Sequence, residues 1–224
     1  MPYIGYFQLI HSVDEFVVYD NIQYTKKGWI NRNRILVDAR DSYITLPLKA
    51  DSDYLDIRER SLALTWPRER SKMLNRIRMA YRKAPHFDPV YAVIEKIILH
   101  ENDNLFGFIL NSLTVINEHL EITTPLLVSS EIPIDHKLRS EAKVLEICAA
   151  RKADTYLNPI GGVALYGRAD FERKGVTLRF LQTRDFQYAQ FCGEFIPFLS
   201  IIDVMMFNSL NVIKDYLSTF FTLQ

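Results

Sequence analysis

The chain has 224 residues, with 27 Lys and Arg against 27 Asp and Glu, so its formal net charge is zero. A hydrophobic content of 48% is enough for a core of its own, and the neutral balance argues against nucleic acid as the main partner. No run approaches the roughly 20 apolar residues of a membrane span, and no secretion signal opens the chain. We therefore expect a cytoplasmic protein in which Cys148 and Cys192 are buried thiols.

The first quarter of the chain is predicted to hold a short helix, a strand and a hairpin. Apolar residues at helical spacing predict the helix over residues 2–13, and the apolar run at 15–20 predicts a buried strand. Two further strands, at 34–37 and 42–48, flank the polar turn 38–41, which is a hairpin signal.

A helical insertion is predicted over roughly residues 66–120, after a short alternating run at 57–64. Pro67 fits the first turn of one helix and Pro89 the first turn of a second, because proline lacks an N–H that these positions do not need. Apolar spacing predicts a third helix over 105–120.

The second half alternates between strands and helices, which favours parallel pairing through crossover connections. We expect an α/β fold with a mixed, largely parallel sheet and flanking helices, built as one domain over residues 1–224. The predicted strands are 126–129, 155–157 and 176–181, and the predicted helices are 137–150, 170–174, 198–206 and 210–221.

Positive charge is concentrated in the segment from Tyr24 to Ile35, which contains no acid. An arginine fork and a lysine charge bind phosphate oxygens, amides bind polar groups, and a tryptophan face stacks on a base or sugar. The segment suits a phosphate-bearing small molecule, and a solvated hairpin with an aromatic plug is an equal alternative. Its chemically informative residues are Lys26, Lys27, Trp29, Asn31, Arg32, Asn33 and Arg34.

Two further motifs are candidate binding sites. Asn158, Gly161 and Gly162 follow a predicted strand, where ligands of α/β sheets bind and where glycine lets backbone N–H groups approach an anion. A tight turn without a ligand is the alternative. Ser200 and Asp203 share one face of an apolar helix, as a polar substrate-binding pair or as a helix cap.

His86, between two predicted helices, is the best placed of the five histidines for acid–base chemistry, although a loop histidine packed on aromatic residues is the commoner arrangement. No spacing of His and Cys predicts a metal site, and no cofactor is expected. The motifs of dinucleotide oxidoreductases, serine hydrolases and P-loop nucleotidases are missing from the sequence.

Several runs together resemble the WbqC-like family across essentially the whole chain. Members usually begin with an apolar strand leading into Gln-Pro-Tyr-Phe, whereas this sequence starts at Met1-Pro2, so a site built partly on that strand is expected to be incomplete. The runs are Pro-Tyr-Ile-Gly-Tyr-Phe-Gln-Leu-Ile at 2–10, Phe-Val-Val-Tyr-Asp-Asn-Ile-Gln-Tyr at 16–24, Lys-Lys-Gly-Trp-Ile-Asn-Arg-Asn-Arg-Ile at 26–35, Tyr-x-x-Ala-Pro at 81–85, Tyr-Leu-Asn-Pro-Ile-Gly-Gly at 156–162 and Pro-Phe-Leu-Ser-Ile-Ile-Asp at 197–203.

The resemblance implies a bacterial transferase that modifies a nucleotide-activated sugar for O-antigen (lipopolysaccharide) or other surface-polysaccharide biosynthesis. It implies N-acylation of a dTDP-amino-dideoxy sugar by glycyl or aminoacyl transfer, from a carrier protein or an activated amino acid. A non-catalytic nucleotide-sugar-binding or scaffold protein of the same pathway is one alternative, and a nucleotidyl- or phosphotransferase is another.

That chemistry needs a bound diphosphate, a deprotonated amine and a stabilised oxyanion. The hypothesis assigns diphosphate binding to Lys26, Arg32 and Arg34, sugar contacts to Asn31 and Asn33, base stacking to Tyr24 and Trp29, amine orientation or deprotonation to Asp20, Asp203 and His86, and oxyanion binding to Asn158, Gly161 and Gly162.

Overall fold

The computed structural model describes residues 1–191 and 193–224, and it confirms the α/β class. The helices are α1 (Ile4–His11), α2 (Trp66–Tyr81), α3 (Phe87–Ile98), α4 (Leu105–Leu120), α5 (Ser140–Arg151), α6 (Arg168–Arg173), α7 (Ile201–Phe207) and α8 (Leu210–Thr219), with short 3-10 turns η1 (Ile57–Glu59), η2 (Ser129–Glu131) and η3 (Ile160–Leu165). The strands are β1 (Phe16–Val18), β2 (Arg32–Val37), β3 (Arg40–Thr45), β4 (Leu126–Val128), β5 (Thr155–Pro159), β6 (Thr177–Thr183) and β7 (Phe221–Leu223).

The strands form three small sheets. β1 pairs in parallel with β4, with Phe16 opposite Leu126, although the two strands are far apart in the sequence. β2 and β3 form an antiparallel hairpin, and β5 pairs in parallel with β6, whose other edge carries β7 in the antiparallel direction. The predicted parallel pairing is therefore present in two of the sheets, while the expected larger sheet is divided.

The hairpin turn is tighter than its sequence suggested. Asp38 and Ala39 both have left-handed backbone conformations, with φ of 49° and 58°, as the two central residues of a type I′ turn require. Arg40 therefore already pairs with Val37, and the second strand begins two residues earlier than predicted. The twist of this turn type matches the twist of the strands, which explains the direct return of the chain.

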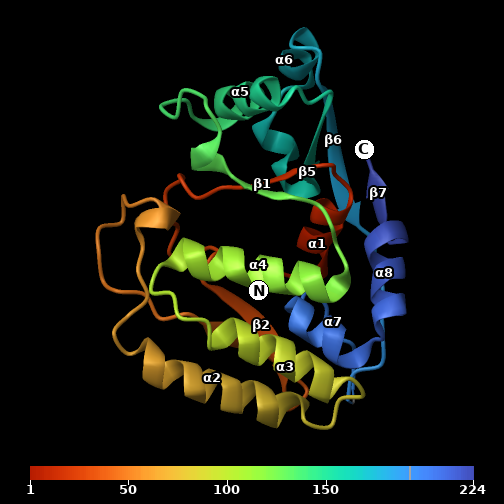
Figure 1. The fold of residues 1–224 in the computed structure, drawn as a ribbon. Helices are drawn as coiled ribbons and strands as arrows, with labels where there is room; N and C mark the ends of the chain where they lie inside the picture. Colours follow the sequence, from red (N-terminus) through yellow and green to blue (C-terminus); the bar gives the residue numbers. More distant parts are fainter. Residues whose placement is uncertain (192) are drawn as a thin grey trace.

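Figure 1 shows two tiers. The lower tier holds α2, α3, α4 and α7 around the β2–β3 hairpin, and the upper tier holds α5 and α6 with β5 and β6. β1 and β4 run between them. The larger hydrophobic cluster includes Trp66, Ile94 and Met205, and a separate small cluster forms around Phe171 in the upper tier. Each tier therefore has a hydrophobic core of its own.

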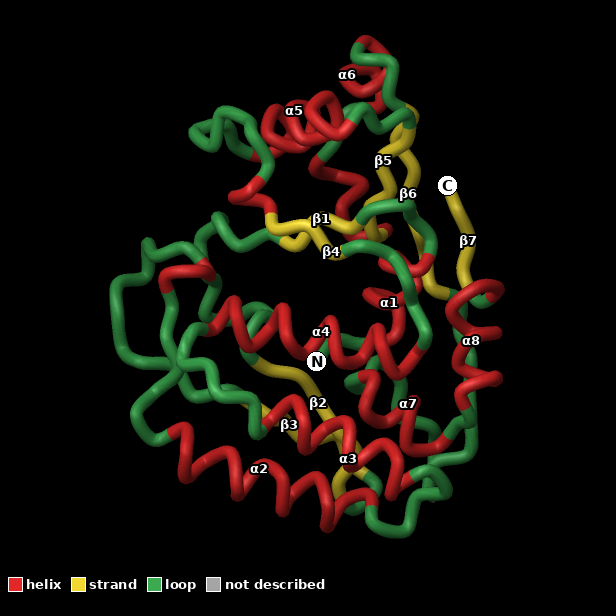
Figure 2. Tube along the Cα trace, viewed as in Figure 1, coloured by secondary structure: helices red, strands yellow, loops and turns green. Residues whose placement is uncertain are grey.

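The alternating run at residues 57–64 forms η1 and isolated bridges. Asp56 and Glu59 form a capping box there, because each side chain accepts a hydrogen bond from the backbone N–H of the other end of the turn. Figure 2 shows the long loops between β3 and α2 at one side of the molecule. The predicted helix 198–206 begins at Ile201, and the last residues of the predicted helix 210–221 give way to β7.

Candidate functional site

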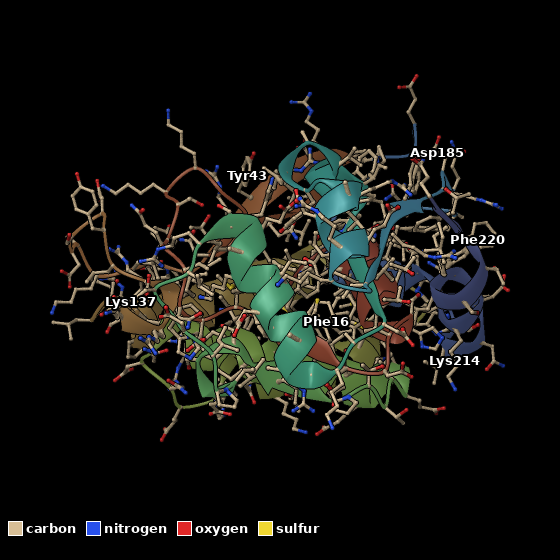
Figure 3. All side chains as sticks on the ribbon, turned by 90° about the horizontal axis from the view of Figure 1, so that it is seen from above. Phe16, Tyr43, Lys137, Asp185, Lys214 and Phe220 are labelled. Carbon is tan, nitrogen blue, oxygen red and sulfur yellow. The ribbon has the colours of Figure 1, made fainter. Side chains whose placement is uncertain are left out.

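A cavity of about 1290 Å³ lies between the tiers. Its walls come from α1, β1, β2, α4, α5 and β5. Phe16 of β1 lines it, and Figure 3, a view from above, places Phe16 near the middle of the molecule beneath α5 and Tyr43 toward the edge. Pockets for one small ligand usually measure about 300–1,000 Å³, so this one can hold an extended molecule or two substrates.

Trp29 and the four residues from Asn31 to Arg34 line one wall of the cavity. The Arg32 guanidinium donates to the carbonyl oxygens of Gly28 (3.1 Å) and Lys27 (2.8 Å). It lies 5.3 Å from the centre of the Tyr43 ring, within the range of a cation–π contact. No carboxylate of the described residues pairs with Arg32, so its positive charge is available to an anionic ligand.

Two other cations of the segment, Arg34 and Lys26, have acidic partners. Arg34 lines the same wall, but its guanidinium donates to Asp41 at 2.9 Å. Lys26 forms an exposed ion pair with Asp53 at 2.6 Å and is not part of the cavity wall. Two of the four cations of the segment are thus neutralised by acids, Lys27 does not line the cavity, and Arg32 is the member best placed to meet a phosphate.

Asn31 and Asn33 are mostly engaged in holding the wall together. The Oδ1 of Asn31 accepts from the Tyr24 hydroxyl (2.9 Å), and its Nδ2 donates to the Leu46 carbonyl (2.9 Å). The Nδ2 of Asn33 donates to the Met1 carbonyl at 2.9 Å. Tyr24 is buried behind the wall, and Trp29, which is 57% exposed, is the aromatic residue of the segment that faces the cavity.

Asn158, at the end of β5, also lines the cavity. Gly161 and Gly162 belong to η3 and do not. A Cβ at Gly162 would meet the end of the Asn158 side chain, which would have to move, whereas a side chain at Gly161 would meet open space. The predicted oxyanion role of the two glycines remains a prediction.

Asp203 lies in the main core, fully buried on α7. Its carboxylate accepts hydrogen bonds from the hydroxyls of Tyr81 (2.8 Å) and Tyr188 (2.6 Å) and from Nε2 of Gln190 (2.8 Å). Burial raises the pKa of Asp203, and these hydrogen bonds only partly oppose the rise. The network ties the segment after β6 to α2 and α7, outside the cavity wall.

Asp20 follows β1, is buried, and contacts the first residues of η2. It accepts from the Ser129 hydroxyl (2.8 Å) and from the Ser130 hydroxyl (2.6 Å) and backbone N–H (2.9 Å). Burial acts to raise the pKa of Asp20, but the hydrogen bonds outweigh it and the pKa is lowered. Asp20 therefore stays ionised and fastens the ends of the two parallel strands.

Ser200 and His86 both lie at helix starts. The Ser200 hydroxyl accepts from the Ile202 N–H as the cap of α7, and it donates to the Met1 carbonyl at 3.0 Å. His86 precedes α3, and its backbone N–H donates to the Met206 carbonyl. Neither residue lines the cavity, nor do Asp20 and Asp203, so the catalytic and substrate-binding roles predicted for these four remain predictions.

Sequence reasoning missed five tyrosines that line the cavity, Tyr3, Tyr6, Tyr19, Tyr156 and Tyr166. The only signal was an aromatic content of 12%, which does not tell a pocket tyrosine from a core one. It also missed Lys143 of α5, a buried cation whose Nζ donates to Oδ1 of Asn21 at 2.7 Å.

The comparison with known families decides what kind of protein this is. A sequence model of the WbqC-like protein family matches residues 1–215. The chain belongs to the WbqC-like protein family. This WbqC-like protein is 30% identical over 222 residues to a Mycobacterium tuberculosis protein described as "Uncharacterized protein Rv1507c", in an alignment that covers 97% of this chain and 93% of the relative. No solved structure matches the chain.

Two further observations apply to the described part of this WbqC-like protein. Its helices are all too short or too polar to cross a membrane. Within residues 1–191 and 193–224, no three His, Cys, Asp or Glu side chains come close enough to hold a metal ion. Cys148 is a free, buried thiol, as predicted, and Cys192 lies outside the described residues.

Proposed function

We propose that this WbqC-like protein is a transferase that acts on a nucleotide-activated sugar in O-antigen or surface-polysaccharide biosynthesis. The family resemblance supports this class, and the substrate is a dTDP-linked amino-dideoxy sugar. The observation that carries the proposal is Arg32, a cation without a carboxylate partner among the described residues, on the wall of a large cavity. A diphosphate would supply the missing negative charge.

Trp29 would bind the base. Its ring stacks on Tyr43, with centroids 6.0 Å apart, and is otherwise exposed at the cavity. An exposed aromatic face beside an arginine suits a nucleoside diphosphate, because the base stacks while the phosphates pair with the guanidinium. In this assignment the buried Asn31 and Asn33 hold the wall that presents both groups.

The proposed reaction is amide formation between the sugar amine and an activated amino acid such as glycine. The amine nitrogen forms a bond to the acyl carbon, the bond from that carbon to its thiolate or phosphate leaving group breaks with the electron pair going to the leaving group, and the proton lost by the amine ends on that leaving group. The size of the cavity supports two substrates bound at once, because it exceeds the usual volume for a single ligand.

The experiment is incubation with a dTDP-amino sugar and an activated glycine, followed by mass analysis of the sugar nucleotide. We expect a mass gain of one glycyl residue. Arg32→Ala should weaken dTDP-sugar binding at least tenfold, because a charge-assisted contact to phosphate is lost. The matched control is Lys26→Ala, which removes a cation of the same segment that lies off the cavity wall and pairs with Asp53. Equal effects of the two substitutions would contradict the proposal.

A non-catalytic nucleotide-sugar-binding protein is the second candidate. One observation favours it: Asp20, Asp203 and His86, the side chains predicted to act on the amine, all lie off the cavity wall. Thermal stabilisation by the dTDP sugar without any product, across all glycine donors, would select this function over the first.

A further inference from the structure

The upper tier presents a group of tyrosines to the cavity, which we term the phenol cluster: Tyr19, Tyr156 and Tyr166. Tyr19 directly follows β1, Tyr156 lies in β5, and Tyr166 follows η3. Tyr156 and Tyr166 meet edge to face, with ring centroids 5.7 Å apart. Two parts of the chain that are distant in the sequence, residue 19 and residues 156–166, thus bring phenol rings to one end of the cavity.

The cluster is held in place by the small upper core. Tyr156 stacks on the fully buried Phe171 with centroids 5.5 Å apart. Its hydroxyl donates to Oδ1 of Asn158 at the long distance of 3.4 Å, so the amide of Asn158 keeps capacity for a second partner. A rigid aromatic wall with one spare amide is the surface that a small cyclic polar ligand requires.

Tyr19 has the most unusual hydroxyl. It lines the cavity, yet no described protein group accepts from it or donates to it. Burial, with smaller contributions from Tyr166 and Cys148, raises the pKa of Tyr19, so the hydroxyl is a neutral donor and acceptor at any physiological pH. The hydroxyl is not among the fully buried atoms without a partner, so solvent reaches it, and a ligand that covers it has to supply a hydrogen bond in return.

Lys143 fixes the ring of Tyr19. Its Nζ lies 5.3 Å from the ring centroid and donates to the backbone carbonyl of Asn21 (3.2 Å) and to the Asn21 side chain (2.7 Å). Burial, with a contribution from Arg139, lowers the pKa of Lys143. The lysine is nearly inaccessible, does not line the cavity, and is therefore a positioning residue for Tyr19.

We infer that the phenol cluster is the sugar subsite of the proposed nucleotide-sugar substrate, with Tyr19 and Asn158 as specificity-determining hydrogen-bond partners. The inference rests on the proposed function. A sugar ring offers apolar C–H faces that pack on aromatic rings, and its hydroxyl or amino groups need the partners that Tyr19 and Asn158 supply. The substrate then spans the two tiers, with its diphosphate at Arg32 in the lower tier.

Neutral phenols do not suit the charged half of the substrate. A diphosphate gains most from cations, and the segment with Trp29 and Arg32 is on the lower-tier wall. A purely apolar ligand does not suit the phenol cluster, because it would bury the Tyr19 hydroxyl and the Asn158 amide without partners. The sugar is the part of the molecule that fits the remaining end.

The test compares two probes, dTDP and a dTDP-amino sugar, by titration calorimetry on the full chain. Tyr19→Phe removes one hydroxyl and keeps the ring. We expect it to weaken binding of the dTDP-amino sugar about three- to tenfold and to leave dTDP affinity unchanged, because one neutral hydrogen bond is lost at the sugar end. Lys143→Met should give part of the same selective loss, and Lys143→Arg should restore most of it.

The control is Tyr91→Phe. Tyr91 lies on α3, stacks on Phe87 and is not part of the cavity wall, so neither probe should change in affinity. Equal weakening of both probes by Tyr19→Phe, or no weakening of either, would overturn the sugar subsite while leaving nucleotide binding intact. Failure of the wild-type chain to bind dTDP itself would instead overturn the proposed function, and the subsite with it.

Discussion

Two buried carboxylates, Asp20 and Asp203, each accept three hydrogen bonds, yet their pKa values move in opposite directions. The residues around each carboxylate are termed the Asp20 corner and the Asp203 corner. Around Asp20 the donors include a backbone N–H, and they outweigh burial, so its pKa falls. Around Asp203 the donors are two phenols and an amide inside the main core, and burial outweighs them, so its pKa rises.

The difference shows that the number of hydrogen bonds does not set the charge of a buried acid. Depth in apolar surroundings sets the cost of the ionised form, and the donors have to exceed that cost. Asp20 lies where two strands end and the chain turns polar, whereas Asp203 lies on a helix whose neighbours Ile202, Val204 and Met206 are all buried. The surroundings of Asp20 stabilise its negative charge, whereas Asp203 holds the loop that carries Tyr188 and Gln190 in place.

The largest expected effect comes from removing the acceptor at Asp203. Asp203→Leu leaves Tyr81, Tyr188 and Gln190 without their common acceptor, and we expect a loss of about 3–5 kcal/mol in the free energy of unfolding. Urea denaturation followed by circular dichroism measures it. Asp203→Asn keeps one acceptor oxygen and should lose clearly less, so an equal loss for the two variants would show that packing, not hydrogen bonding, matters there.

Asp20→Ala should have a smaller effect, about 2–3 kcal/mol, because Ser129 and Ser130 lie near the polar turn and water can replace part of the lost bonding. The same urea experiment measures it. Asp14→Ala, an exposed acid a few residues earlier, is the matched control and should change stability by less than about 0.5 kcal/mol.

The pH dependence of stability sharpens the comparison directly. Because the folded pKa of Asp203 is raised, its favourable contribution is present at low pH and is lost as pH rises through that pKa. The lowered pKa of Asp20 gives the opposite: its contribution is present above the unfolded value and is lost as pH falls through the folded pKa.

The free energy of unfolding, measured between pH 3 and 7 for wild type, Asp20→Asn and Asp203→Asn, gives the direction of both pH dependences. The difference in the free energy of unfolding between wild type and Asp203→Asn should become smaller as pH rises. The same difference for Asp20→Asn should become smaller as pH falls. Each change should be about 1.4 kcal/mol per unit of difference between the folded and unfolded pKa values. If both differences changed in the same direction with pH, the opposite pKa shifts of Asp20 and Asp203 would be contradicted.

The smallest expected effect is that of Tyr188→Phe, about 1 kcal/mol, since one neutral donor to Asp203 is lost. Tyr81→Phe should cost more, because the Tyr81 hydroxyl also accepts from the Leu36 N–H at 2.8 Å, which would be left unsatisfied. Thermal unfolding of the two variants side by side tests the order, and a larger loss for Tyr188→Phe would contradict it.

Local signals predicted much of the fold. Apolar spacing predicted the bounds of α4 correctly, and in the structure Asn104 caps its first turn and the left-handed Glu121 ends it. β7 was missed because its pairing with Leu181 and Thr183 of β6 depends on a contact some forty residues away. The division of the strands into three sheets is also set by tertiary contacts, which the spacing of strands and helices does not encode.

The candidate site shows the same limit. Residues of the segment from Tyr24 to Ile35 were selected by charge, but the pairing of Arg34 with Asp41 and of Lys26 with Asp53 depends on where the chain returns. The polar face of Asp203 was predicted, whereas its partner Tyr81 lies 122 residues away. Side-chain types identified candidate chemistry, and only the fold showed which candidates share a cavity.

The two tryptophans of this chain occupy opposite environments. Trp66 is buried against Phe108 in the main core, while Trp29 is exposed on the cavity wall. The protein therefore carries two intrinsic fluorophores that report on different events. Quenching of the long-wavelength emission of Trp29 follows occupancy of the cavity, and a red shift of the Trp66 emission follows global unfolding, so ligand association and denaturation can be recorded in one unlabelled sample.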